Sequence, residues 1–258
     1  MPSGHTTQKT TQRREPAHVK SARRTLLSAL AMVCLLVATT TACLKDDAGT
    51  GTYVSATADP RPYEQWLAAR ADIPADLALP GKFLTVAGHD AAKGPGRVLR
   101  YRLEVEDGID IDARYLARAV HETLNDPRSW GGGRGTIALE RVSSGDSSFT
   151  VTLASTGTVN SWCAKDDLDT GEQRVSCNVA STRRVMLNAW RWSAGSPTYG
   201  DDLANYRRML VNHEVGHRLG HFHETCERSG ALAPVMMQQT LTLVTGAATC
   251  VANPWPYP

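Results

Sequence analysis

Apolar and polar residues alternate most regularly between residues 97 and 106. Leu99, Tyr101, Leu103 and Val105 fall on one face of an extended chain, and the positions between them carry arginine or glutamate. A period of two is typical of a strand with one buried face, so a strand is predicted over 97–106. Shorter apolar runs predict further strands over 83–86, 137–141, 149–153 and 185–187.

Two segments have the spacing of an α-helix. The first follows Asp110, an expected N-cap, and ends near Pro127, with apolar residues recurring at helical intervals. The second begins near Asp201 and Asp202 and carries two adjacent apolar stripes, which is expected of a helix buried between two parts of a domain. The predicted order is therefore strands, a helix, further strands and a second helix.

The N-terminus is an export or anchoring segment. Residues 1–24 form a basic cytoplasmic segment or signal-peptide n-region with six basic groups and one acidic group, and residues 25–44 are mostly apolar. The apolar segment is long enough to span a bilayer, and its core also fits a signal peptide. Thr41-Ala42-Cys43 resembles the end of a bacterial lipoprotein signal. All three interpretations place the rest of the chain outside the cytoplasm, either membrane-anchored (transmembrane or lipid) or secreted.

A domain boundary is expected near residue 82. Residues 45–81 are rich in small and polar residues and contain four prolines, so they are predicted to be a linker or a short propeptide-like segment. Residues 82–258 hold the predicted strands and helices and form the expected folded domain.

The net charge of the whole chain differs in sign from that of the expected exported part. The chain has a formal net charge of +2, but residues 25–258 carry 22 basic and 25 acidic groups, a net of −3. A mildly acidic domain gives no electrostatic basis for binding nucleic acid. The only expected membrane contact is through the N-terminal segment, and nothing in the sequence indicates an oligomer.

Four cysteines lie in the expected domain: Cys163, Cys177, Cys226 and Cys250. An even number in an exported domain favours disulfides, and four cysteines allow three connectivities. Pairing each cysteine with its nearest neighbour, Cys163 with Cys177 and Cys226 with Cys250, is favoured because each pair brackets a short segment with turn-forming residues.

The candidate chemistry is concentrated in one motif, H-E-V-G-H-R-L-G-H-F-H. His213 and His217 are four residues apart, so on a helix both imidazoles lie on one face and can reach the same ion. Glu214 is turned toward a neighbouring sector, from which it can reach a water on the metal. Gly220 can end the helix and let the chain return with His223 as a third ligand.

The third ligand can be narrowed by elimination. After Arg228 the chain has no Asp, Glu or His, so a distant downstream ligand is excluded. The local candidates are His221, His223, Glu224 and Glu227. His221 would serve if the helix continued past Gly220, but a glycine favours a turn and hence His223. Three nitrogen ligands and one water are typical of a catalytic zinc site. The expected ligands of a single Zn²⁺ ion are His213, His217 and His223.

The motif matches H-E-x-x-H-x-x-G-x-x-H at all its fixed positions, and in this the chain resembles the metzincin zinc peptidases. The resemblance implies an α+β, metzincin-like fold. Such a fold has a small twisted mixed sheet, two main helices above the zinc cleft, and a short irregular C-terminal subdomain, held here by the expected Cys226–Cys250 bridge. The domain also resembles an uncharacterised metzincin-like family of exported actinobacterial proteins.

The resemblance also assigns supporting residues. Metzincins carry a methionine turn beneath the zinc, and Ala233-Pro234-Val235-Met236-Met237-Gln238 fits it, with Met236 favoured over Met237. Glu224 directly follows His223, where astacins have a glutamate that supports the site from behind. Gly220, Glu224 and Met236 are thus the expected structural support.

The resemblance predicts an extracytoplasmic zinc metalloendopeptidase acting on protein or peptide substrates. Glu214 would take a proton from the zinc-bound water that attacks the peptide bond. Two alternatives remain: a non-catalytic zinc-containing envelope or binding protein, and a cell-wall peptide amidase. The presence of Glu214 argues against the first alternative, since structural zinc needs no base.

Overall fold

The computed structural model describes residues 52–53, 58–132 and 136–258. The basic and apolar segments expected over 1–24 and 25–44 lie outside these residues. In the part that is described, no helix combines the length and the hydropathy needed to cross a bilayer.

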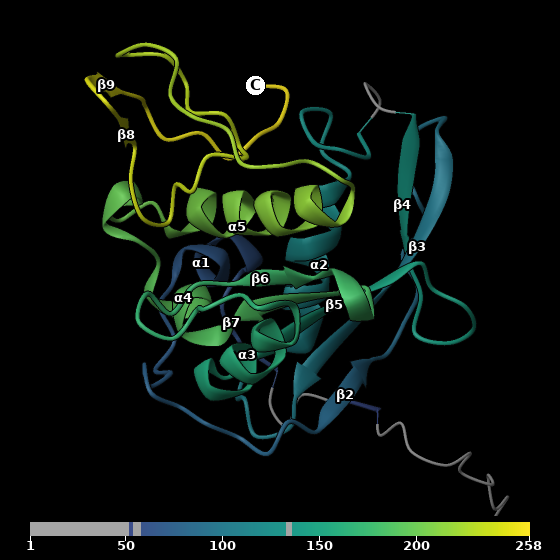
Figure 1. Cartoon of the computed structure of the whole chain (residues 1–258). Coiled ribbons are helices and arrows are strands. Elements are labelled where there is room, and N and C mark those ends of the chain that lie inside the picture. The colour runs from purple at the N-terminus through teal and green to yellow at the C-terminus, as the bar shows by residue number, and fades with distance from the viewer. Residues whose placement is uncertain (1–51, 54–57, 133–135) are drawn as a thin grey trace, which may run out of the picture. The chain divides into compact units, whose positions relative to one another are not determined.

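A mixed β-sheet forms the framework (Figure 1). Its central strands β3, β5 and β7 are parallel, β4 pairs parallel with the first half of β3, and β6 closes one edge antiparallel to β7. The strand predicted over 97–106 is confirmed at the same limits. The strands of this sheet are β1 (Thr52–Tyr53), β2 (Phe83–Val86), β3 (Arg97–Glu106), β4 (Ile137–Arg141), β5 (Phe149–Ala154), β6 (Cys177–Val179) and β7 (Arg184–Asn188).

The described residues form five α-helices, so the α+β class is confirmed. The two predicted helices are α2 and α5; α2 is capped by Asp112 rather than Asp110, and α5 by Asp202, because these carboxylates accept the first free amides of each helix. The helices are α1 (Tyr63–Ala68), α2 (Ala113–Leu124), α3 (Thr156–Cys163), α4 (Ala189–Ala194) and α5 (Leu203–Arg218).

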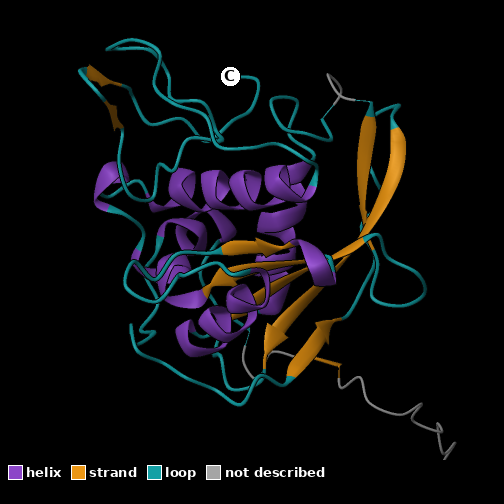
Figure 2. Ribbon diagram, in the orientation of Figure 1, coloured by secondary structure: helices purple, strands orange, loops and turns teal. Residues whose placement is uncertain are grey.

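Helix α5 lies between the sheet and the C-terminal segment, residues 221–258 (Figures 1 and 2). Its buried residues include Leu210, Val211 and Val215, which belong to the main core together with Leu103 of β3 and Leu116 of α2. The C-terminal segment is mostly irregular and contains a two-stranded hairpin, β8 (Val244–Thr245) and β9 (Ala248–Thr249). A helix covered on two sides explains the wide apolar arc seen in its sequence.

Both favoured disulfides are present, Cys163–Cys177 and Cys226–Cys250. The first joins the end of α3 to β6 and belongs to a small core cluster. The second belongs to a separate cluster with Ala233 and Met237 in the C-terminal segment. Each bond therefore fixes a region that has few apolar contacts of its own.

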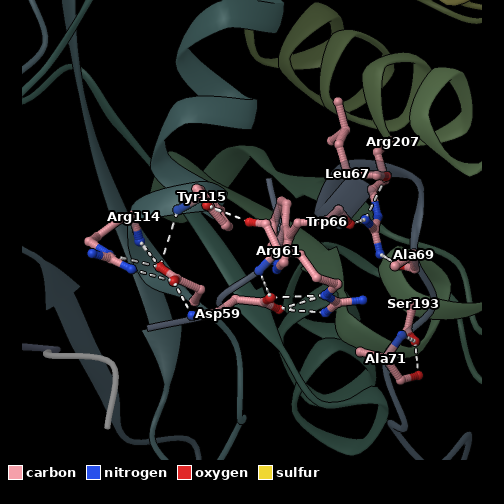
Figure 3. A network of polar contacts seen from close by, with 11 residues as sticks. Asp59, Arg61, Trp66, Leu67, Ala69, Ala71, Arg114, Tyr115, Ser193 and Arg207 are labelled. Carbon is pink, nitrogen blue, oxygen red and sulfur yellow. Dashed lines mark hydrogen bonds and ion pairs between the residues drawn. The ribbon is translucent and has the colours of Figure 1, made fainter. Parts of the chain in front are cut away.

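The main core extends before residue 82, into the segment that was expected to be a linker or a short propeptide-like segment. Tyr63, Trp66 and Leu67 of α1 are only 6%, 5% and 2% exposed and join the main core. Their spacing of three and four residues puts them on one face of the short helix. Figure 3 shows how polar contacts fasten this segment: Arg207 of α5 donates to the carbonyls of Trp66, Leu67 and Ala69.

Candidate metal centre

The structure brings the three expected ligands together. His213 and His217 lie one turn apart on α5, and Gly220, with a φ of 96°, ends the helix in the left-handed region that favours glycine. The chain then returns with His223. The ligand nitrogens of the three histidines all lie within 4.8 Å of one another, and His217 Nε2 is 3.1 Å from His223 Nε2.

His221 does not join this triad. Its ring is stacked on Trp130, with ring centroids 4.3 Å apart. The turn at Gly220 explains the difference, because a continued helix would have placed His221 one turn beyond His217.

Backbone carbonyls orient two of the imidazoles. His213 Nδ1 lies 2.9 Å from the carbonyl oxygen of Val235, and His217 Nδ1 lies 2.9 Å from that of His221. A carbonyl can only accept, so each Nδ1 must carry the proton and donate it. Each Nε2 is then left with a lone pair, which is the form that binds a metal.

The surroundings keep these imidazoles neutral. Burial, followed by the neighbouring His217, lowers the pKa of His213 to about 3. Burial also lowers the pKa of His217 and of His223. Because a metal binds only the neutral ring, the triad is in its ligating form at physiological pH.

Glu214 is the one buried carboxylate beside the triad. It is 5% exposed, and burial raises its pKa to about 8. Among the described residues its side chain has no hydrogen bond or ion pair. It lines the same cavity as the three histidines.

Met236 lies directly against the ligand helix. A Cβ built on Gly216 would overlap Sδ of Met236 and lie 3.0 Å from Cζ2 of Trp130. Met237, by contrast, belongs to the cluster around the Cys226–Cys250 disulfide. Of the two methionines, therefore, Met236 contacts the helix between the two histidines.

Glu224 contributes through its backbone. Its amide donates to the carbonyl of Met236 at 3.1 Å, while its side chain is exposed and has no polar partner among the described residues. The expected support of the site by this residue is seen in the main chain and not in the carboxylate.

Sequence analysis did not identify the residues that support helix α5 through contacts with Asn212. Trp130 Nε1 donates to the carbonyl of Asn212 at 2.8 Å, and Ser129 Oγ donates to the Asn212 side chain at 2.6 Å. Asn212 in turn donates to the carbonyl of Pro254 at 2.8 Å. These contacts span 42 to 83 residues of sequence, and no local pattern marks them.

A cavity of about 490 Å³ opens onto the triad. One wall is the loop closed by the Cys163–Cys177 disulfide, and another is formed by residues 238–241. The triad thus faces open space on one side and the carbonyls that orient it on the other.

The donor set fits a zinc ion. Ligand nitrogens about 2.0–2.1 Å from a tetrahedral centre are about 3.3 Å apart, close to the 3.1 Å between His217 Nε2 and His223 Nε2. Three neutral nitrogens with one open side match a catalytic site, whereas a structural site closes the fourth position with protein.

An α+β domain with three convergent imidazoles defines a candidate transition-metal centre. The family model described as "Protein of unknown function (DUF3152)" matches residues 73–258, and the chain belongs to this family. Neither a curated protein nor a solved structure matches the chain.

Proposed function

We propose that the chain is an extracytoplasmic zinc-dependent endopeptidase of the metzincin type. One observation carries the proposal: three neutral histidines and a buried, unpaired Glu214 share a single cavity. A non-catalytic zinc protein has no need of a carboxylate whose burial is so costly.

The roles of the residues follow from their positions. His213, His217 and His223 would hold the ion through their nitrogens. When bound, zinc supplies Lewis-acid chemistry, which lowers the pKa of a water molecule to about 7 and polarises a carbonyl group. Glu214 would accept the proton of the attacking water at a carboxylate oxygen and later give it to the leaving amine.

Other features support the metzincin type and the compartment. Met236 packs against Gly216 of the ligand helix, a contact that a methionine turn near the zinc would make. Helix α5 lies between the sheet and an irregular C-terminal segment that carries a disulfide (Figure 1). Two disulfides also favour an oxidising compartment outside the cytoplasm.

The test measures zinc content and peptide hydrolysis for the purified full-length chain and its variants. We expect one zinc per chain, lost in His223→Ala and kept in Glu214→Gln. Turnover of casein-derived peptides should fall by about 100- to 10,000-fold in Glu214→Gln, the usual contribution of a general base. His89→Ala is the matched control, because His89 is an exposed histidine paired with Glu140 away from the cavity.

Two results would contradict the proposal. A chain that binds no zinc would remove the peptidase, and substantial hydrolysis by Glu214→Gln would remove the role of this carboxylate. Release of peptides from purified cell wall, with none from casein, would replace the endopeptidase by the cell-wall amidase.

A further inference from the structure

Phe222 is the most exposed large apolar side chain in the described part of the chain. It is 84% exposed, and the next most exposed, Leu232 and Val251, are each at 52%. It stands between His221 and His223 and lines the cavity beside the triad. A single exposed apolar residue is ordinary on a protein surface, so its position and its neighbouring residues decide whether it has a role.

The backbone around Phe222 is fixed. The amide of His221 donates to the carbonyl of Gly216 at 3.0 Å, and that of Glu224 donates to Met236 at 3.1 Å. The carbonyl of His221 also accepts from His217 Nδ1. The exposure of Phe222 is therefore built into the site, because the residues on both sides of it are held in place.

A second exposed apolar residue lines the same cavity. Leu168 is 42% exposed and lies on the loop closed by the Cys163–Cys177 disulfide. Its amide donates to the carbonyl of Cys163 at 3.2 Å, so this wall is also fixed. Two preformed apolar groups at one cavity can bind an apolar ligand group with little loss of conformational freedom.

The charged residues that line the cavity further restrict which ligands it can bind. Asp167 and Asp169 line the wall that carries Leu168, and no lysine or arginine lines the cavity. An acidic side chain on this wall would meet the two aspartates and lose water without a lysine or arginine to pair with. An uncharged apolar side chain meets neither cost.

We propose that Phe222 and Leu168 form a recognition site for a large aliphatic or aromatic side chain of a peptide substrate, close to the bond that is cleaved. This inference rests on the proposed peptidase function and adds the substrate class. Peptides with acidic residues at this position are poor ligands.

The test uses peptide binding and does not require turnover. Fluorescently labelled peptides, identical except for a central Leu-Leu, Gln-Gln, Lys-Lys or Glu-Glu pair, are titrated into the zinc-loaded full-length Glu214→Gln chain and followed by anisotropy. We expect the Leu-Leu peptide to bind about tenfold more tightly than the Gln-Gln peptide, because burying one large apolar side chain supplies at least that factor. The Glu-Glu peptide should bind most weakly.

Substitutions of Phe222 test whether this residue produces the preference for apolar peptides. Phe222→Ala should bring the Leu-Leu and Gln-Gln affinities within about threefold of each other, and Phe222→Leu should keep the preference. Val98→Ala is the matched control: Val98 is 50% exposed on β3 and does not line the cavity. Equal affinities for all peptides, tightest binding of the Lys-Lys peptide, or a preference that survives Phe222→Ala would each overturn the inference.

Cleavage of the same peptides by the chain with native Glu214 separates the two proposals. Hydrolysis without any apolar preference rejects the recognition site and leaves the peptidase standing. An apolar preference in binding without hydrolysis supports the recognition site and rejects the peptidase.

Discussion

Gly216 lies between His213 and His217 on the ligand helix, where Met236 and Trp130 pack closely against it. Alanine at an exposed helix position would gain about 1 kcal/mol over glycine from helix propensity alone. Here the added methyl group would overlap Met236 and press on the Trp130 ring. Overpacking of this kind costs about 1–3 kcal/mol, so we expect Gly216→Ala to be destabilising in urea unfolding, with zinc bound more weakly.

A double-mutant cycle with Met236→Ala checks that the overlap is the cause. If Met236 is the obstacle, the double variant should lose less stability than the two single variants summed. An additive cycle, or a Gly216→Ala variant as stable as the parent, would show that the helix moves aside freely.

The convergence of the three histidines could be predicted from sequence, and their surroundings could not. The spacing of His213, His217 and His223 is local and follows from helix geometry and one glycine. The contact of Trp130 with Gly216 depends on a loop 86 residues away, which has no periodicity to read. The same holds for the carbonyl of Val235 behind His213, since any residue type supplies a carbonyl.

A single buried guanidinium binds the C-terminal end of helix α1. Arg207 is 2% exposed and donates to four carbonyls, those of Trp66, Leu67, Ala69 and Trp192, at 2.7–3.1 Å. The first two belong to α1 and the third to its C-cap, where carbonyls lack helical partners and a cation is favoured (Figure 3).

Arg207→Met should therefore release α1 while filling most of the space of the side chain. We expect a loss of about 2–4 kcal/mol in urea unfolding, because several buried carbonyls lose their donor. Trypsin should then cut the native protein near Arg70. Arg208→Met is the control: Arg208 forms a 3.9 Å ion pair with the exposed Glu64 and donates a 3.1 Å hydrogen bond to Oδ1 of Asn205 within its own helix. The loss of these two contacts should cost no more than about 1 kcal/mol. Equal stability of the two variants would contradict this account.

At the scale of elements, length helped prediction, although the short strands β2 and β4 were also predicted at their observed limits. Strand β3 and helices α2 and α5 have 10, 12 and 16 residues, enough for several periods of alternation. Helix α1 has six residues and strand β6 only three, fewer than two periods of their respective patterns. These elements form because the larger framework offers them partners, a signal that lies outside their own sequence.

The whole domain is assembled around α5, and the two disulfides fix different sides of it. The Cys226–Cys250 bond belongs to the C-terminal segment, which supplies the Val235 carbonyl to His213. The Cys163–Cys177 bond closes the loop that forms one wall of the cavity. One bond therefore supports the candidate metal ligands, and the other supports the proposed substrate-binding wall.

Removing each disulfide separately should affect zinc binding in one variant and peptide binding in the other. By chain entropy, each double Cys→Ser variant should lose about 3 kcal/mol in urea unfolding, because the loops closed are of similar length. Cys226→Ser with Cys250→Ser should also weaken zinc binding in competition with a chelator, since the carbonyl that orients His213 is then less firmly placed. Cys163→Ser with Cys177→Ser should bind zinc as the parent does and lose affinity for apolar peptides. Equal zinc affinity in both variants would mean that the C-terminal segment holds the ligands without its disulfide.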